Sequence, residues 1–354
     1  MKIEIFRRAP FVDREQEIDF LVEWFNRVPQ RILWVYGPKS SGKTTVMEYV
    51  VENYLLKDKK RFWVKYFNLR ETVISSYDSF LDTFFVELEK SESEKGARIG
   101  INVFGFKSEV WERIKEKKIN LFKAFIEELW KIRGKEKRCV MIIDEIQKLR
   151  DLYIKNGNGA RELLKEFLNF CVRLTKETHL SHVAILTSNT IFIERIYNDA
   201  KLKKTSEFWK VDPLKKERVR EWLREEGFGE EEIGLVWEYL GGCIPDLIKV
   251  IEARKSGRDL KEHLEREAWL AYTEIVDFMV RGDFTEKDIE MFEKIAEEIL
   301  QKGYFELTKE KREYLKIIET WAEKEILFYD PLELKVTGNS RVYEKAMERV
   351  VGEQ

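Results

Sequence analysis

Cysteine and histidine are scarce in this chain of 354 residues. The three cysteines, Cys139, Cys171 and Cys243, are odd in number and lie in apolar segments. A disulfide framework is therefore excluded, and we expect buried free thiols in a reducing compartment. Because the three histidines have no cysteine pair to complete a tetrahedral set of ligands, a zinc site is excluded as well.

Long apolar runs and an excess of one charge are also missing. No apolar stretch approaches the length of a membrane span, and residues 1–5 do not resemble a signal peptide, so we expect a soluble, cytoplasmic protein. Charged residues make up 37% of the chain, yet the net charge is only -2, which gives no overall attraction to nucleic acid. The hydrophobic fraction of 44% indicates a globular chain with a substantial core.

Short apolar strands alternate with amphipathic helices in the first half of the chain, a pattern typical of a parallel sheet covered by helices. The predicted strands are Ile32–Tyr36, Phe62–Phe67, Cys139–Ile143, Val183–Thr187 and Phe208–Val211. The predicted helices are Asp13–Val28, Thr44–Leu56, Ser79–Lys90, Lys118–Ile132 and Gly159–Thr178. Residues 96–106 alternate small and apolar side chains, which indicates either a hairpin or loop over the ligand or an ordinary surface excursion.

The second half is helical from Pro213 to about Phe278, which predicts a small helical lid. After a break at Gly282, two helices, two strands joined by a turn and the helix Arg341–Val350 form an order typical of a winged helix. We therefore expect three domains: a P-loop α/β domain over residues 1–212, a helical lid over 213–280 and a winged-helix domain over 281–354.

The segment from Gly37 to Thr44 fits the G-x-x-x-x-G-K-S/T phosphate-binding loop and lies between a predicted strand and a predicted helix. Its glycines let backbone N–H groups surround a phosphate, and the helix N-terminus adds partial positive charge. We expect Lys43 to reach the β- and γ-phosphates and the Thr44 hydroxyl to bind Mg²⁺. The predicted nucleotide contacts here are Gly37, Pro38, Lys39, Ser40, Ser41, Gly42, Lys43, Thr44 and Thr45. The sequence thus predicts a site for a nucleoside triphosphate.

A pair of acids follows the predicted strand Cys139–Ile143. This strand delivers Asp144 and Glu145 to the carboxyl edge of the sheet, where open α/β folds bind their ligands. We expect Asp144 to hold the Mg²⁺, directly or through water, and Glu145 to act as the general base that activates the attacking water.

Polar residues also follow the predicted strand Val183–Thr187. Asn189 is the candidate catalytic residue that orients the water or senses the γ-phosphate, and Thr187 and Ser188 are rivals for that role. The structural alternative for these residues is the capping of a turn.

These motifs together resemble a known family. Phe11-Val12-Asp13-Arg14-Glu15-Gln16-Glu17 resembles the Φ-x-G/D-R-E-x-E box of archaeal AAA+-type ATPases, which are relatives of the STAND NTPases and, more distantly, of origin-recognition initiators. Asp144-Glu145-Ile146-Gln147 resembles their D-E-Φ-Q segment, and Gly241-Gly242-Cys243-Ile244-Pro245 resembles the glycine–proline turn of their lid. The resemblance covers about residues 9–340. It implies a five-stranded parallel sheet with the phosphate-loop strand central and an additional strand between it and the Asp144 strand, or beside it.

The resemblance also implies how the nucleotide is bound. Arg14 would border the base and ribose, and Pro245 would lie near an adenine. One segment departs from the family pattern, since residues 198–205 contain lysines but no arginine to contact the γ-phosphate. Arg195 and Lys204 are the substitutes that the sequence offers, but neither stands at the expected place. Slow hydrolysis, or hydrolysis that needs a cation from another subunit, is therefore expected.

Charge distribution bears on the partner. Residues 57–61 and 133–138 are rich in lysine and arginine, but acids accompany them, so we interpret them as solvated loops before strands rather than phosphate contacts. From Arg281 to the end of the chain there are 13 basic and 18 acidic residues, which argues against a DNA-reading wing. We expect this domain to contact a protein partner or to fold back on the nucleotide site.

The sequence is thus interpreted as an ATP-binding, Mg²⁺-dependent P-loop NTPase. It would hydrolyse ATP to ADP and phosphate and switch the lid and winged helix between two arrangements. One alternative is an ATP-gated, DNA-binding loader or initiator-like ATPase that uses the winged helix. Another is a nucleotide-binding regulator with negligible turnover, as the missing arginine would allow.

Overall fold

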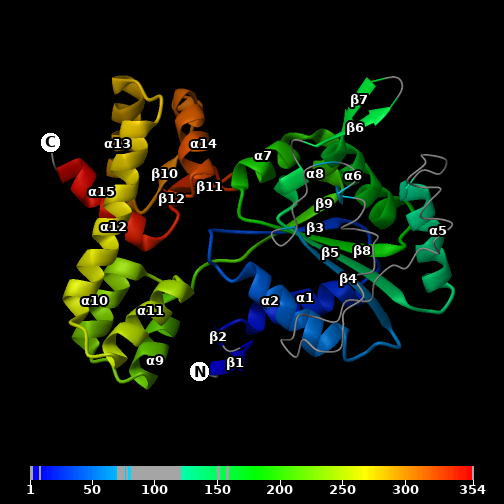
Figure 1. Ribbon diagram of the computed structural model, residues 1–354, viewed down its shortest axis with the longest axis horizontal. Coiled ribbons are helices and arrows are strands. Elements are labelled where there is room, and N and C mark those ends of the chain that lie inside the picture. The colour runs from blue at the N-terminus through cyan, green and yellow to red at the C-terminus, as the bar shows by residue number, and fades with distance from the viewer. Residues whose placement is uncertain are drawn as a thin grey trace.

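A five-stranded parallel sheet organises the first part of the molecule (Figure 1). The computed structural model describes residues 3–7, 9–69, 76, 79–80, 121–149, 152–156 and 159–352. The strands are β3 (Ile32–Tyr36), β4 (Phe62–Asn68), β5 (Arg138–Asp144), β8 (Ser181–Thr187) and β9 (Ser206–Lys210), and their order in the sheet is β4-β5-β8-β3-β9. The five predicted strands are confirmed, and each predicted end lies within two residues of the observed one.

The prediction that the phosphate-loop strand is central is wrong. The central strand is β8, which lies between β3 and the strand β5 that carries Asp144. The additional strand between those two is therefore confirmed. Among the described residues, β9 is the one strand on the other side of β3, so the phosphate-loop strand is second from the edge of the sheet.

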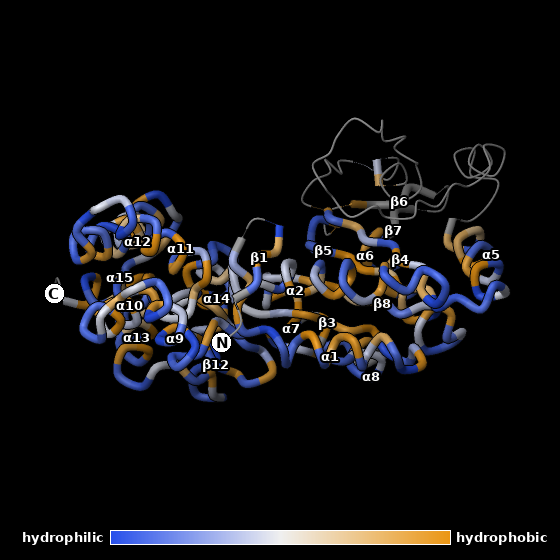
Figure 2. The backbone as a smooth tube through the Cα atoms, turned by 90° about the horizontal axis from the view of Figure 1, so that it is seen from below, coloured by the Kyte–Doolittle hydropathy of each residue, from blue (hydrophilic) through white to orange (hydrophobic). Residues whose placement is uncertain are grey.

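Alternate side chains of each strand enter two different cores. Leu33 and Val35 of β3 pack with apolar residues of α1 (Glu15–Asn26), α2 (Lys43–Val50) and the π-helical turn η1 (Val51–Leu55). Ile32, Trp34 and Tyr36 pack on the other face. The elements on that face are α5 (Leu121–Arg133), the 3₁₀ turn η2 (Ile146–Leu149), α6 (Leu163–Val172), the π-helical turn η3 (Arg173–Glu177), α7 (Thr190–Asn198) and α8 (Ala200–Lys204). Figure 2 shows hydrophobic positions recurring along these helices and strands between hydrophilic ones.

Two antiparallel hairpins were not predicted from the sequence. The first pairs β1 (Ile3–Phe6) with β2 (Ala9–Val12), and the second pairs β6 (Tyr153–Asn156) with β7 (Gly159–Glu162). The predicted helix start at Gly159 is wrong, because the chain is a strand there and α6 begins at Leu163. Residues 81–90 of one predicted helix, and the segment 96–106, lie outside the described residues.

Four helices follow β9 and share a core of their own. They are α9 (Lys216–Glu225), α10 (Glu230–Leu240), α11 (Ile244–Lys255) and α12 (Leu260–Arg281). The remaining elements are α13 (Glu286–Lys302), β10 (Phe305–Glu306), the 3₁₀ turn η4 (Arg312–Tyr314), α14 (Leu315–Glu323), β11 (Leu327–Asp330), β12 (Lys335–Gly338) and α15 (Arg341–Gly352). The strands β10, β12 and β11 form an antiparallel sheet in that order, which gives the predicted winged-helix arrangement with one short strand, β10, that was not predicted.

Two findings concern the chain as a whole. Cys139, Cys171 and Cys243 are free and buried, as the sequence predicted. Among the described residues, no helix combines the length and the apolar composition needed to cross a lipid bilayer.

A close backbone approach ties the helical lid to the end of the sheet, and it generates a prediction. Leu214 N donates to Gly242 O at 3.0 Å, and a Cβ at residue 242 would lie 1.9 Å from Leu214 O. We expect Gly242→Ala to lower the free energy of unfolding by about 3 kcal/mol, because the two segments must separate. Denaturant unfolding measures this change.

Gly234, in the interior of α10, is the matched control because a Cβ there meets nothing within 4 Å. Gly234→Ala should raise the free energy of unfolding by about 0.5–1 kcal/mol. Equal effects of the two substitutions would contradict the close approach at Gly242.

Candidate nucleotide-binding site

The phosphate loop leaves the carboxyl end of β3 through backbone conformations that glycine favours. Gly37 has a φ of 150°, and a Cβ at this position would lie 2.3 Å from Val211 O. Gly42 has a φ of 92° and precedes the first turn of α2. Side chains larger than hydrogen are therefore strained at both positions, which explains the two glycines of the motif.

Lys43 is buried at the start of α2, with 6% of its surface exposed. Its ammonium group donates to Gly37 O at 3.0 Å and to Pro38 O at 2.7 Å. A third contact of 3.4 Å joins it to Ser41 Oγ. The loop thus wraps around the lysine side chain and holds its positive charge inside the loop.

The two predicted metal ligands lie in contact. Thr44 Oγ1 donates to Asp144 Oδ2 at 2.7 Å, and Asp144 is 1% exposed. Tyr66 of β4 also donates to this carboxylate, at 3.3 Å. Burial raises the pKa of Tyr66 well above its usual value and the negative charge of Asp144 raises it further, so the phenol remains a donor. A hydroxyl and a carboxylate that leave other positions to water and phosphate oxygens fit the ligand preference of Mg²⁺.

Glu145 is joined to the end of β8 by a chain of hydrogen bonds. Gln147 Nε2 donates to Glu145 Oε2 at 2.6 Å, and Gln147 Oε1 accepts from the Thr187 hydroxyl at 3.0 Å. Glu145 is 7% exposed and has a φ of 64°, which is uncommon for a residue with a side chain. The Glu145 carboxylate is therefore held in one orientation by Gln147, which follows β5, and through it by Thr187 at the end of β8.

Asn189 lies at the end of this chain, but its side chain has a structural contact. Its backbone N–H donates to Thr187 Oγ1 at 3.0 Å, and its Oδ1 accepts from Phe192 N at 2.9 Å in the first turn of α7. The capping that the sequence left as an alternative is therefore present, and Thr187 rather than Asn189 contacts Gln147.

Arg14 supports the loop from the other side. Its guanidinium donates to Ser41 O at 2.6 Å, to Asp212 O at 3.1 Å and to Glu17 at 2.8 Å. Only 4% of Arg14 is exposed. One planar group thus connects the phosphate loop with the segment that follows β9.

A cleft of about 300 Å³ opens beside the loop. Its apolar walls come from the first hairpin and from the start of α11, namely Pro10, Phe11, Val12, Ile244, Pro245 and Ile248. Its polar walls are Arg14, Lys39, Ser40, Gly42, Lys43, Thr44 and Thr45. Phe11 stacks on Tyr49 of α2 with ring centroids 4.4 Å apart, which fixes one wall. This volume lies at the lower end of the range for small-molecule sites.

The structure thus brings together most of the predicted site residues. Those of the phosphate loop, Arg14 and Pro245 surround one cleft, and Asp144 reaches it through Thr44. Gly37, Pro38 and Ser41 contact Lys43 rather than lining the cleft. The roles of four residues were not predicted from the sequence: Tyr66, Gln147 and the apolar wall residues Phe11 and Ile248. Phe11 and Gln147 nevertheless lie inside the quoted family motifs.

Comparison with known sequences identifies relatives of nearly the full length. Residues 11–250 match the model of a family described as an ATPase domain predominantly from Archaea. An uncharacterized ATP-binding protein of Methanocaldococcus jannaschii is 33% identical, over 90% of this chain and 93% of the relative. A second such protein, from Pyrococcus abyssi, is 34% identical over 96% of this chain and 98% of its own length.

Solved structures share the fold at lower identity. A Walker-type ATPase of Pyrococcus abyssi has a TM-score of 0.59 at 17% identity and covers 96% of both chains. The ORC2 protein of Aeropyrum pernix, solved in ADPNP–ADP complexes, has a TM-score of 0.51 at 12% identity, over 96% of this chain and 94% of the other. The predicted α/β fold, with its distant likeness to origin-recognition proteins, is thereby confirmed.

The contacts of Arg14 generate a prediction for the site. In Arg14→Lys a single ammonium cannot reach the carbonyls of Ser41 and Asp212 together with Glu17, so the loop loses its support. We expect the affinity for a fluorescent nucleotide to fall about tenfold and the free energy of unfolding to fall by about 1–3 kcal/mol.

The matched control is Arg218→Lys, at an arginine whose side chain is 42% exposed and which pairs with Asp13 and Glu221. These two ion pairs of an exposed arginine should contribute little to stability or to binding. If Arg14→Lys bound nucleotide as tightly as Arg218→Lys, the supporting role of Arg14 would be wrong.

Proposed function

The chain belongs to the family of ATPase domains found predominantly in Archaea, and from this premise we propose that it binds ATP with Mg²⁺ and hydrolyses it at the phosphate loop. The observation that carries the proposal is the 2.7 Å hydrogen bond between the Thr44 hydroxyl and the Asp144 carboxylate. It joins the phosphate loop to β5, where the general-base candidate Glu145 comes next in the chain. The ATP-binding relatives support ATP as the nucleotide.

The apolar walls of the cleft support adenine at its base-binding end. Phe11 and Pro245 contribute flat, apolar faces to the lining, and among the described residues no acid or amide that could recognise guanine lines the cleft. The phosphates would lie against the loop, where backbone N–H groups and the Lys43 ammonium supply positive charge.

Each polar residue of the site has a role that its position allows. Lys43 binds the β- and γ-phosphate oxygens, and Thr44 and Asp144 hold the Mg²⁺, which when bound neutralises developing charge on the phosphates. Glu145 accepts the proton of the attacking water, and Gln147 holds its carboxylate in place. Asn189 contributes through the turn that it caps rather than as a catalytic residue.

Hydrolysis is proposed to be slow, because the region after β8 offers no suitable cation among the described side chains. Lys204 ends α8 just before β9, and β9 runs parallel to β3 with Ser206 opposite Ile32. Lys204 therefore lies at the amino edge of the sheet, whereas the phosphate loop follows the carboxyl edge. The missing charge would come from another subunit, or turnover would stay low, as in the alternative of a regulator with negligible hydrolysis.

The C-terminal elements contact the phosphate loop, which supports a conformational switch. Asn339 Oδ1 accepts from Lys39 N at 3.2 Å, and the Lys39 ammonium pairs with Glu325. Asn339 follows β12, and Glu325 lies in the turn before β11. A change in loop conformation on nucleotide binding or hydrolysis would therefore alter the contacts of the winged helix.

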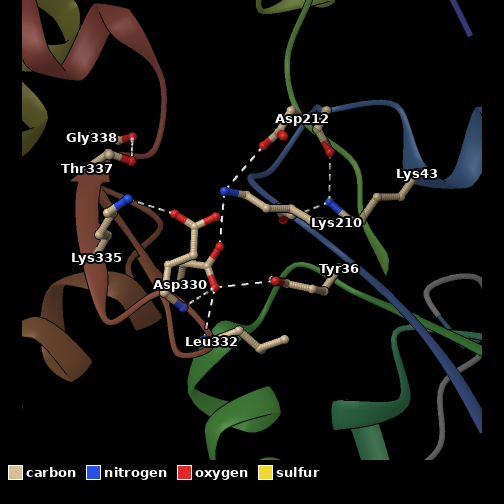
Figure 3. A network of polar contacts seen from close by, with 12 residues as sticks. Tyr36, Lys43, Lys210, Asp212, Asp330, Leu332, Lys335, Thr337 and Gly338 are labelled. Carbon is tan, nitrogen blue, oxygen red and sulfur yellow. Dashed lines mark hydrogen bonds and ion pairs between the residues drawn. The ribbon is translucent and has the colours of Figure 1, made fainter. Parts of the chain in front are cut away.

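Figure 3 shows a polar network around the buried Asp330. Asp330 is 2% exposed at the end of β11, and it accepts from the Tyr36 hydroxyl at 3.3 Å and pairs with Lys210 at 3.0 Å. Burial alone would lower the pKa of Lys210, but the charges of Asp212 and Asp330 outweigh it and raise the pKa. Tyr36 is the last residue of β3, which leads into the loop, and Lys210 is the last of β9, so the network joins the winged helix to β3 and to its neighbour β9.

These contacts favour the switch over an initiator-like loader that uses the winged helix on DNA. Asp330 at the end of β11 contacts Tyr36 of β3 and Lys210 of β9. From Arg281 onward, acidic residues also outnumber basic ones. We therefore propose that the switch acts on a protein partner, which competes with the phosphate loop and the sheet for the winged-helix elements.

The catalytic assignment predicts two different losses. Lys43→Ala should weaken nucleotide binding at least a hundredfold, because it removes the buried ammonium that would bind the phosphate oxygens. Glu145→Gln should bind nucleotide within about threefold of wild type and lose turnover at least a hundredfold, because an amide accepts no proton. Nucleotide titration and phosphate release measure the two quantities.

Glu225→Gln, at an exposed position of α9, controls for the loss of one negative charge. It should keep both binding and turnover. Equal phosphate release by wild type, Lys43→Ala and Glu145→Gln would reject the assignment.

The switch predicts coupling between the buried network and the nucleotide site. Asp330→Ala leaves Lys210 and Tyr36 without their shared acceptor, so the winged helix should undock and ADP affinity should change by about five- to a hundredfold. Hydrogen exchange of residues 325–339 with and without ADP reports the docking, and titration reports the affinity.

Glu333→Ala is the control from the same turn, because the Glu333 side chain is half exposed and forms its ion pair with Lys335, and the backbone N–H that it donates to Asp330 is kept in alanine. It should leave both measurements unchanged. If ADP affinity and exchange in Asp330→Ala equalled those of Glu333→Ala, the network would not couple the two regions.

A further inference from the structure

Positive charge is concentrated in loops that enter the sheet at its amino edge. Residues 57–61, before β4, and residues 133–138, before β5, each contain four basic residues and one acidic residue. Residues 27–31, before β3, contain Arg27 and Arg31 and no acid. The whole chain has 64 basic and 66 acidic residues, so this ratio is local. The three segments 27–31, 57–61 and 133–138 are called here the amino-edge basic surface.

Strand pairing brings these segments together. The parallel pairing of β4 with β5 begins at Phe62 and Arg138, and Arg138 N donates to Arg61 O at 2.7 Å. The Arg138 guanidinium also donates to the carbonyls of Asn26 and Arg27 at the end of α1. In Figure 1 the loops before β4 and β5 lie on the side of the sheet next to α5, away from α13 and α14.

Carboxylates neutralise little of this charge. Within the part of the chain that the structure describes, Arg27 is the one basic residue of the surface that pairs with acids, namely Glu23 and Glu207. Lys59, Lys60 and Lys135 are exposed. Burial lowers the pKa of Arg138, and the like charges of Arg61 and Arg133 lower it further. These groups therefore repel one another in the absence of an anion.

The surface is also hollowed. One hollow of about 550 Å³ is lined by Arg27 and Arg31 together with Trp24 and Glu207. A smaller one of about 60 Å³ is lined by Arg27, Arg133 and Arg138, and the two meet at Arg27. A concave surface with several guanidinium groups matches the shape and the bidentate bonding of phosphate groups.

We propose that the amino-edge basic surface binds the phosphate backbone of a nucleic acid. The segments before β4 and β5 lie about 5 Å apart, and the segment before β3 lies about two strand spacings beyond β5, so the positive charge extends along one edge of the sheet, as contact with a polyanion requires. Lysine is depleted in interfaces between proteins, whereas interfaces with nucleic acid are strongly positive, so the four basic residues in each of the segments 57–61 and 133–138 favour the nucleic acid over an acidic protein. The contacts are with backbone phosphates, which DNA and RNA share.

This surface is separate from the nucleotide cleft and from the winged helix. The cleft follows the carboxyl end of β3, and the surface precedes its amino end, about 16 Å away along five residues of strand. Substitutions on the surface should therefore leave nucleotide binding intact, and the inference does not depend on ATP hydrolysis.

The test uses the full chain and a variant of three exposed lysines, Lys59→Ala/Lys60→Ala/Lys135→Ala. The matched control, Lys255→Ala/Lys261→Ala/Lys287→Ala, removes the same charge from exposed positions of the C-terminal half. Binding to a fluorescent 30-base-pair DNA duplex and to an RNA duplex of equal length is measured by anisotropy from about 50 to 200 mM salt. Polyglutamate serves as the competing acidic polypeptide.

We expect wild type and the control variant to bind at least one duplex with a strong salt dependence. The surface variant should bind at least about tenfold more weakly, with the slope of log affinity against log salt reduced by about two to three. Its melting temperature and nucleotide affinity should equal those of wild type, which shows that it folds. The proposal is overturned if neither duplex binds, if both variants lose affinity equally, or if polyglutamate binds as tightly as the duplexes.

Discussion

The parallel register of β3, β5 and β8 is the constraint on which the other features of the molecule depend. Val183 lies opposite both Ile32 and Met141, so the three strands begin and end at nearly the same level. The phosphate loop, the Asp144–Glu145 pair and the Thr187 turn all follow carboxyl ends and therefore meet without further adjustment. The same register gathers the loops before the strands at the opposite edge, where charge is concentrated in three of them.

Strands were predictable from the sequence because each is a short continuous apolar run, and continuity of this kind indicates a strand buried on both faces. The order of the strands across the sheet was harder to predict from the sequence. It depends on how the crossovers pack, and no residue in β3 shows that β9 alone lies beyond it. Hairpin β1–β2 was missed because its strands contain only four residues each, with little periodicity to detect. Residues 57–61 and 133–138 looked ordinary separately, and only their pairing makes them one surface.

Site residues were predictable where a motif ties chemistry to spacing. Gly37, Gly42, Lys43 and Thr44 are of this kind, and Asp144 follows a strand whose end must reach the same edge. The role of Tyr66 was not predictable, because its position in an apolar strand indicates only a core residue. Its contact with Asp144 arises because β4 pairs with β5. Asn189 was assigned a catalytic task from its position after β8, yet the same position begins α7 and requires a cap, which its side chain supplies.

Lys39 occupies one of the positions that the phosphate-loop motif leaves open, and it is this residue that contacts Asn339 and Glu325. The residues that the phosphate-loop motif fixes and the residue that contacts the winged helix are therefore different positions of the same short segment. Lys39 also lines the cleft, and a substitution at residue 39 alters the attachment while leaving the residues that the motif fixes unchanged. Position 39 thus allows the strength of the link between the nucleotide site and the winged helix to vary within one unchanged motif.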